Sequence, residues 1–121
     1  MEYYQDFELD ARVVKGILRR KGVTALLHAN TVGTSCTFLA QGALLSRAAV
    51  QARRLFQTSQ SSDPLDKRFR IWNDVLVDAV DIHNRKSARN FYGPVLFELN
   101  FGILGRAPVR SVIVTKKHPT T

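Results

Sequence analysis

The chain has 121 residues, 45% of them hydrophobic and 23% charged, with a formal net charge of +8. This size and composition predict one soluble globular domain, and no apolar run approaches the roughly 18 residues that a membrane span needs. The single cysteine excludes an internal disulfide and a cysteine-rich zinc site. Because the N-terminus is acidic and polar, it resembles neither a signal nor a transit peptide, and we expect a cytoplasmic protein.

The positive charge is distributed unevenly along the chain. Residues 1–10 carry four acids and no base, and residues 11–62 carry eight bases and no acid. Segregated positive charge suits a polyanion, so we expect a nucleic acid as partner. The alternative is a basic surface that only faces solvent. The residues expected to contact phosphates are Arg12, Arg19, Arg20, Arg53 and Arg54.

In chain order, the first predicted element is a helix that ends at Gly22, a residue typical of the position after a helix. Its apolar residues recur at helical spacing and predict a buried stripe. These residues are Leu9, Val13, Val14, Ile17 and Leu18. The apolar run at residues 23–30 then predicts a short buried strand.

Two further helices are predicted from their capping residues. Thr31 can cap a second helix that ends at Gly42, and Ser46 can cap an Ala-rich third helix that runs to about Phe56. The expected apolar stripe of the second helix consists of Val32, Cys36 and Leu39. The spacing places Cys36 inside this stripe, which predicts a small core residue.

The second half of the chain has the pattern of strands. Residues 57–64 are polar and aperiodic, which predicts a loop, and residues 83–90 predict a short basic helix or turn. The remaining apolar runs predict strands at residues 74–80, 95–99 and 109–115. Helices mainly in the first half and a small, mostly antiparallel sheet in the second half indicate an α+β fold. We expect residues 1–121 to form a single domain, either complete or a truncated member of a larger fold.

Several polar residues lie in apolar surroundings and are candidates for a site. His28 is either a core histidine or a polar group that faces a ligand pocket. Trp72 follows a run of cations, where it would stack on bases or anchor the core. Asp78, Asp81 and His83 could bind a divalent metal, but this spacing is common by chance and we assign no metal. The alternative is a strand-end aspartate that pairs with Arg85 or caps the following turn.

Two segments resemble a known family. Leu26-Leu-His-Ala-Asn-Thr31 and Gly42-Ala-Leu-Leu-Ser-Arg47 are similar to the opening of the ADP-ribosyltransferase fold, in particular the toxin branch that modifies DNA bases. Members of that branch begin with a strand that ends in a histidine with a nearby Thr or Asn, followed by a helix and a Gly-Leu-Leu turn. The resemblance covers residues 23–47 well and the remainder loosely.

The resemblance implies NAD as cofactor and a set of site residues. His28, Asn30 and Thr31 would lie at the nicotinamide ribose, and the polar loop at 57–62 would lie near the substrate base. Arg47, or else Arg53 or Arg54, would bind the dinucleotide phosphates through bidentate hydrogen bonds. The family also uses a late glutamate that stabilises the developing positive charge. Beyond Asp81 this chain has only Glu98 to fill that role.

The sequence therefore predicts an ADP-ribosyltransferase-like domain that binds NAD and acts on or binds nucleic acid, and it leaves enzymatic activity open. Three alternatives stand beside it. The first is a non-catalytic basic module that binds nucleic acid, and the second is a metal-dependent phosphodiesterase built on Asp78, Asp81 and His83. The third is a structural homo-oligomer in which the strands at 95–99 and 109–115 pair across subunits.

Overall fold

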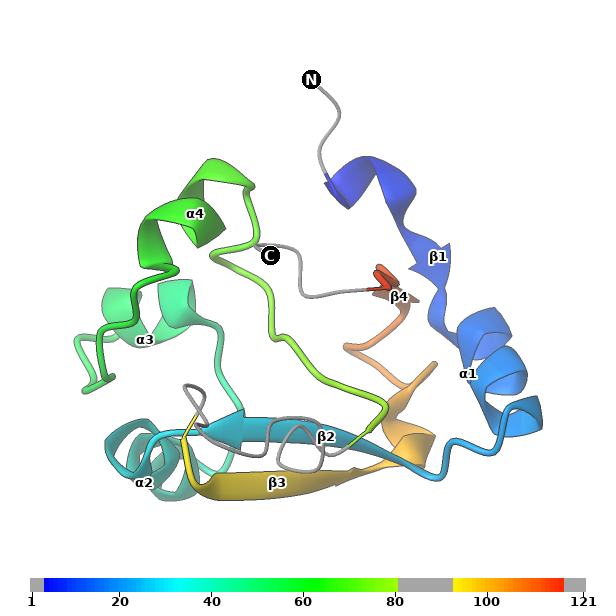
Figure 1. Cartoon of the computed structure of the whole chain (residues 1–121), viewed down its shortest axis with the longest axis horizontal. Helices are drawn as coiled ribbons and strands as arrows, with labels where there is room; N and C mark the ends of the chain where they lie inside the picture. The colour runs from blue at the N-terminus through cyan, green and yellow to red at the C-terminus, as the bar shows by residue number, and fades with distance from the viewer. Residues whose placement is uncertain (1–3, 81–92, 117–121) are drawn as a thin grey trace.

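The computed structural model describes residues 4–80 and 93–116, with the side chains of residues 4 and 5 excluded. Figure 1 shows two small sheets with helices at both ends of the molecule. In chain order the elements are η1 (Tyr4–Phe7), β1 (Leu9–Asp10), α1 (Ala11–Arg20), β2 (Ala25–Asn30), α2 (Val32–Gln41), α3 (Arg47–Ala52), α4 (Asp63–Arg68), β3 (Val95–Asn100), η2 (Phe101–Ile103) and β4 (Ser111–Val112). The longest helices of this part, α1 and α2, have ten residues each, and no helix there has the length and hydropathy of a membrane span.

Helices together with small antiparallel sheets give the α+β class that the sequence predicts. β2 pairs with β3 over its whole length, from Ala25 opposite Asn100 to Asn30 opposite Val95, and β1 pairs with β4. Each sheet therefore takes one strand from each half of the chain. The expected division into a helical first half and a sheet in the second half is not what the pairing shows, because strands distant in sequence complete each other's hydrogen bonds.

Helix α1 forms where expected but buries only part of the predicted apolar stripe. Asp10 caps it, since the backbone N–H of Arg12 donates to the Asp10 carboxylate at 2.8 Å. The buried residues are Ala11 and Val14, whereas Val13 is 61% exposed and Ile17 is also exposed. The predicted stripe is therefore correct for Val14 and for Leu18, which packs against the core, and wrong for Leu9, Val13 and Ile17, which are exposed.

Helix α2 confirms both predicted ends. The Thr31 hydroxyl accepts a hydrogen bond from the Thr34 N–H, and Gly42 ends the helix in the left-handed conformation with φ of 68°. The predicted core stripe is wrong, because Leu39 is 69% exposed and Cys36 is exposed. The buried face instead carries Thr34, Ser35 and Phe38.

The next two helices differ in how well the sequence predicted them. Ser46 caps α3 as expected, with the Ala49 N–H donating to its hydroxyl at 3.1 Å, but α3 ends at Ala52 and not near Phe56. Arg54 has a positive φ of 56° and turns the chain away. Helix α4 begins inside the segment predicted as a loop, and Pro64 in its first turn is the signal that was available.

The segment at 74–80 is not the predicted strand. It runs along the free edge of β2 and makes one bridge, in which the backbone groups of Leu27 and Asp78 exchange hydrogen bonds of 2.8 and 2.7 Å. The strand predicted at 109–115 is reduced to β4. The element predicted at 83–90 lies outside the described residues.

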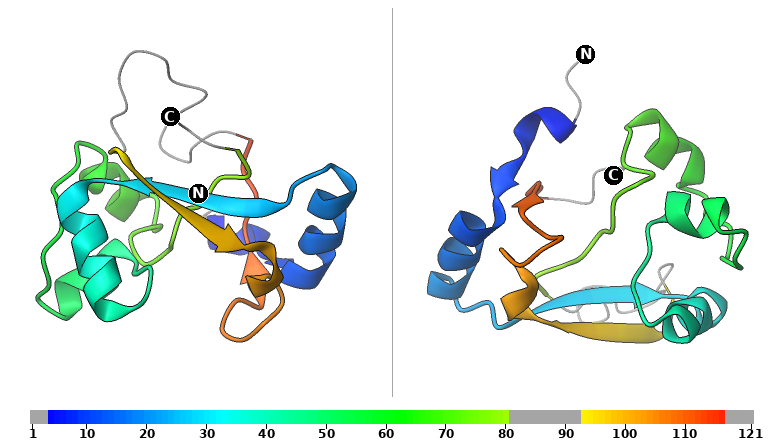
Figure 2. Two further views of the ribbon diagram at one scale, coloured as in Figure 1. Left: turned by 90° about the horizontal axis from the view of Figure 1, so that it is seen from below. Right: turned by 180° about the vertical axis from the view of Figure 1, so that it is seen from behind.

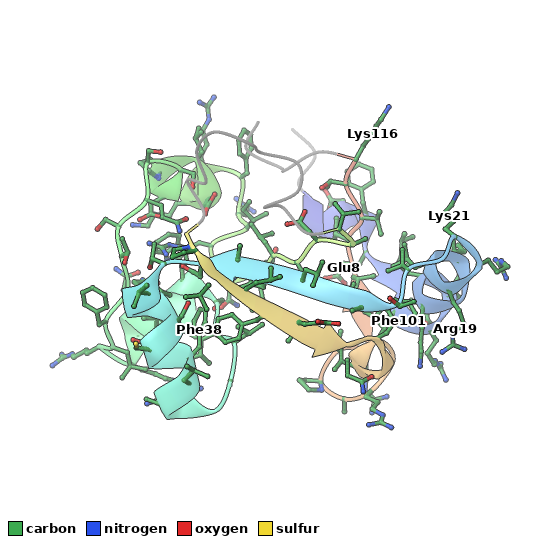
Figure 3. All side chains as sticks on the ribbon, turned by 60° about the horizontal axis from the view of Figure 1, so that its bottom comes forward. Glu8, Arg19, Lys21, Phe38, Phe101 and Lys116 are labelled. Atoms are coloured by element: carbon green, nitrogen blue, oxygen red, sulfur yellow. The ribbon has the colours of Figure 1, made fainter. Side chains whose placement is uncertain are left out.

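The core has two parts at opposite ends of β2. One part packs Ala11 of α1 against Leu26, Phe101 and Leu104. Figure 3 places Phe101 beside α1 and Phe38 on α2 at the other end. There the ring of Phe38 contacts the rings of Phe97 and His28, with centroids 6.0 and 5.9 Å apart. The second part therefore positions the candidate site.

Candidate functional site

His28 occupies a defined orientation near the C-terminal end of β2. Its Nδ1 lies 2.6 Å from the carbonyl oxygen of Leu76, and its Nε2 lies 3.0 Å from Nδ2 of Asn30. A carbonyl only accepts, so Nδ1 carries the hydrogen and Nε2 accepts from the Asn30 amide. Both ring nitrogens are thus engaged within the protein. His28 offers a ligand its ring surface and no free hydrogen-bonding nitrogen.

The imidazole of His28 is neutral at pH 7. Burial lowers the pKa of His28 below its usual value of 6.5, while the hydrogen bond to Leu76 and the charge of Asp78 act in the opposite direction. Desolvation is the largest of these effects. The pocket wall formed by this ring is therefore uncharged and aromatic.

Asn30 and Thr31 connect β2 to α2 and are the other two predicted cofactor residues. Asn30 is 6% exposed, and its Oδ1 accepts from the Thr31 N–H at 2.8 Å. The Thr31 hydroxyl caps α2 and lies 2.8 Å from the hydroxyl of Thr58. Thr31 does not line the pocket that His28 and Asn30 share, and its hydroxyl instead caps α2.

Arg47 is the first residue of α3, and its guanidinium is held in one orientation. Nη2 donates to Asp63 Oδ2 at 2.9 Å and to the Thr58 carbonyl at 2.8 Å, and Nε lies 2.9 Å from Asp63 Oδ1. The guanidinium carbon also lies 5.3 Å from the centroid of the Trp72 ring. The two N–H groups of Nη1 have no partner among the residues that the structure describes. One edge of the guanidinium therefore remains available to a ligand.

The pocket brings together His28 and Arg47, which the sequence placed on separate elements. Its volume is about 90 Å³, and Asn30 and Phe38 also contribute to its wall. Typical small-molecule pockets measure roughly 300–1,000 Å³, so this one admits only one end of a dinucleotide. The loop that the resemblance placed near the substrate base does reach the pocket, through Gln57, Gln60 and Ser62.

Carboxylates dominate the charge of the pocket. Asp66, Asp74 and Asp78 line it, and Arg47 is its one cationic residue among those described. Burial raises the pKa of Asp74, and the negative charge of Glu8 raises it further. Since Asp63 already neutralises Arg47, the interior favours a cationic or neutral group over an anion. The sequence did not predict these aspartates as a shared site, although Asp74 and Asp78 lie in the apolar run at residues 74–80.

Glu98 does not join this pocket. It pairs with Leu27 across the β2–β3 ladder, whereas the neighbouring pair His28 and Phe97 faces the other side of the sheet, with ring centroids 6.4 Å apart. Successive side chains of a strand point to opposite faces. Glu98 is exposed and lines a separate, shallow hollow with Thr24 and Asn100. Its assignment as a catalytic residue beside Arg47 is therefore not supported by the geometry.

The structure divides the five predicted phosphate-binding arginines into two groups. Arg12, Arg19 and Arg20 belong to α1, and Arg53 and Arg54 follow α3. These helices lie at opposite ends of the molecule (Figures 1 and 2). All five side chains are exposed, and Arg12 also lies 3.6 Å from the Asp10 carboxylate that caps its own helix. Only Arg53 and Arg54 are on the side of the pocket.

The alternative of a metal site built on Asp78, Asp81 and His83 gains no support from the described residues. No group of three potential ligands comes together there, and Asp81 and His83 lie outside the described ranges.

Comparison with known proteins gave no relative: no family model, no curated protein and no solved structure matches this chain.

Proposed function

We propose that this chain is an ADP-ribosyltransferase-like domain that binds NAD in the pocket between His28 and Arg47. The observation that carries the proposal is the meeting of these two side chains, which come from β2 and α3 and line one hollow together with Asn30. The same three residues belong to the two segments that resemble the family.

The charge of the pocket supports a particular direction of binding. The nicotinamide ring of oxidised NAD carries a positive charge, which the carboxylates of Asp66, Asp74 and Asp78 would favour. The neutral ring of His28 and the buried amide of Asn30 would form the apolar and polar walls around it. A pocket of about 90 Å³ has no room for the remainder of the dinucleotide, so the phosphates would lie outside, toward Arg47.

NAD would act as the ADP-ribose donor: the bond between its ribose carbon and nicotinamide would break, and a nucleophilic atom of a nucleic-acid base would form the new bond to that carbon. Positive charge would develop on the sugar between these two events. Carboxylates that line a pocket stabilise such charge as it develops, because they are already in place before the reaction. Asp66, Asp74 and Asp78 would take this part here, since Glu98 is on the other face of the sheet. His28 and Arg47 would orient the ligand without exchanging protons with it.

Calorimetry with NAD tests the proposal directly. We expect heat of binding at millimolar NAD, a weaker signal for the His28→Leu and Arg47→Met variants, and unchanged binding for Arg19→Met. The last variant removes one positive charge at the far end of the molecule, so it controls for general electrostatics. Absence of heat at millimolar NAD would remove NAD from the proposal.

A non-catalytic nucleic-acid-binding function remains the second candidate. Within residues 47–72 the exposed charged side chains are all basic, since Asp66 is buried and Asp63 is half-buried. These exposed residues are Arg53, Arg54, Lys67, Arg68 and Arg70. Their phosphate contacts predict affinity for an oligonucleotide that falls steeply with salt. Binding that does not change with salt, in a titration followed by anisotropy, would exclude this function.

A further inference from the structure

Trp72 presents an aromatic ring that is fixed in place beside the pocket. Its indole Nε1 donates to Gln51 Oε1 at 3.1 Å, and its backbone carbonyl accepts from the Ala48 N–H at 3.0 Å. Both partners belong to α3, so the ring is tied to the helix that begins with Arg47. The indole N–H and the backbone of Trp72 are thus both hydrogen-bonded to one helix, which holds the ring in a defined orientation.

Two cations from different helices contact this one ring. The Arg47 guanidinium carbon lies 5.3 Å from its centroid, and the ammonium nitrogen of Lys67 lies 4.5 Å from it. The two positive groups are therefore at most about 10 Å apart, the sum of these two distances, and the ring attracts both. Two cations therefore share one spot beside Trp72.

The two cations differ in how far their charge is neutralised. Arg47 forms a two-point ion pair with Asp63. Asp63 lies one helical turn before Lys67 on α4 and is the residue with which Lys67 would ordinarily pair. Because its carboxylate is turned to Arg47, Lys67 forms no ion pair with any residue in the described ranges. The spot therefore has one uncompensated positive charge and the open Nη1 edge of Arg47.

We propose that Lys67 and Arg47 bind one diphosphate between them, beside the ring of Trp72, and that Lys67 is a ligand-binding residue of this chain. We call this pair the diphosphate clip. A diphosphate carries its negative charge over several oxygens on two adjacent phosphorus atoms, which suits two cations that contact one ring and are at most about 10 Å apart. Arg47 would donate from Nη1 as a directed hydrogen bond, and Lys67 would act as a mobile point charge.

The clip deepens the proposed function and rests on it for the identity of the ligand. The pocket next to it is acidic and the clip is basic, and Arg47 belongs to both. NAD has the complementary polarity, with a pyridinium cation at one end and a diphosphate in its middle. The two adjoining regions of opposite charge therefore match one ligand in one direction.

Titrations with ADP and with inorganic pyrophosphate test the clip independently of the nicotinamide end. Trp72 is the only tryptophan, so its fluorescence reports on binding beside its own ring. We expect Lys67→Met to weaken ADP binding by about tenfold, the usual effect of losing one hydrogen bond between charged groups. Lys67→Arg keeps the charge and should restore affinity to within about threefold of wild type.

Arg68→Met is the matched control, since it removes the same charge from the next position of the same helix. We expect it to change ADP affinity by less than about twofold, as an exposed charge away from the contact does. Equal effects of Lys67→Met and Arg68→Met would overturn the clip and leave only general electrostatics. A Trp72 emission that stays constant during saturation with pyrophosphate would also overturn it.

A third titration, with a single-stranded oligonucleotide, distinguishes binding of a dinucleotide from binding of a nucleic acid backbone, which carries similar phosphate oxygens. If Lys67→Met weakens binding of a single-stranded oligonucleotide but not of ADP, the diphosphate assignment is wrong. The outcome for the clip is distinct from that for the NAD proposal. ADP binding that depends on Lys67, without any preference for NAD, would retain the clip and contradict the proposed function.

Discussion

Gly93 offers the sharpest test of how the fold positions the site. Its φ is +109°, and a Cβ built at this position would lie 2.3 Å from the carbonyl carbon and oxygen of Asn30 and 2.4 Å from the Thr31 nitrogen. These atoms form the peptide bond that joins β2 to α2. A Gly93→Ala substitution must therefore move backbone that carries Asn30 and, through its amide, the ring of His28.

The expected loss of stability has two parts. An L-residue at a positive φ costs about 1–2 kcal/mol, and forcing an extra carbon into closely packed atoms costs about 1–3 kcal/mol. We therefore expect Gly93→Ala to lower the free energy of unfolding by about 2–5 kcal/mol. Gly42→Ala is the matched control, because Gly42 also has a positive φ, of 68°, but an added Cβ there meets nothing within 4 Å. It should cost only the conformational part, about 1–2 kcal/mol.

Urea denaturation followed by Trp72 fluorescence measures both values. The folded fraction of Gly93→Ala should also bind NAD less tightly than wild type, whereas Gly42→Ala should retain wild-type affinity. If the two variants lose the same stability, the close approach of Gly93 to the Asn30–Thr31 peptide has no energetic consequence, and the reasoning fails.

Three further predictions follow from single contacts. A double-mutant cycle with Arg47→Met and Asp63→Asn should give a coupling energy of about 1–3 kcal/mol, because the two side chains are only 15% and 19% exposed; a coupling near zero in chemical denaturation would show that the pair is no stronger than a surface contact. The lowered pKa of His28 means that the unfolded chain takes up a proton more readily than the folded one, so its contribution to stability is present above about pH 6.5 and is lost as the pH falls below that value. Unfolding curves at several pH values should show this loss in wild type and not in His28→Gln. The raised pKa of Asp74 acts with the opposite sign: it favours the folded state at low pH, and this contribution is lost as the pH rises through the pKa that Asp74 has in the folded protein. Exposed Cys36 should react with a thiol reagent in native buffer at nearly the rate seen in urea, and protection from labelling without denaturant would place it back in the core.

The sequence determined the local features of this protein. Thr31 and Ser46 cap helices, Gly42 ends one, and the apolar runs that became β2 and β3 were visible without any structure. Such features depend on residues within about four positions of one another, so composition and spacing decide them. The same holds for the motif that singled out His28 and Arg47.

Only the tertiary structure decided which faces and partners these elements would have. Which apolar residues of α1 are buried depended on where the chain after β3 packs. Asp63 reached Arg47 from 16 residues away, and the register of β3 on β2 placed Phe97 beside His28 and turned Glu98 to the other face. Contacts of this kind join residues that are distant in the sequence, so the chain between them must close into a loop. One local sequence pattern is compatible with many such arrangements, and the packing of the whole molecule selects one of them.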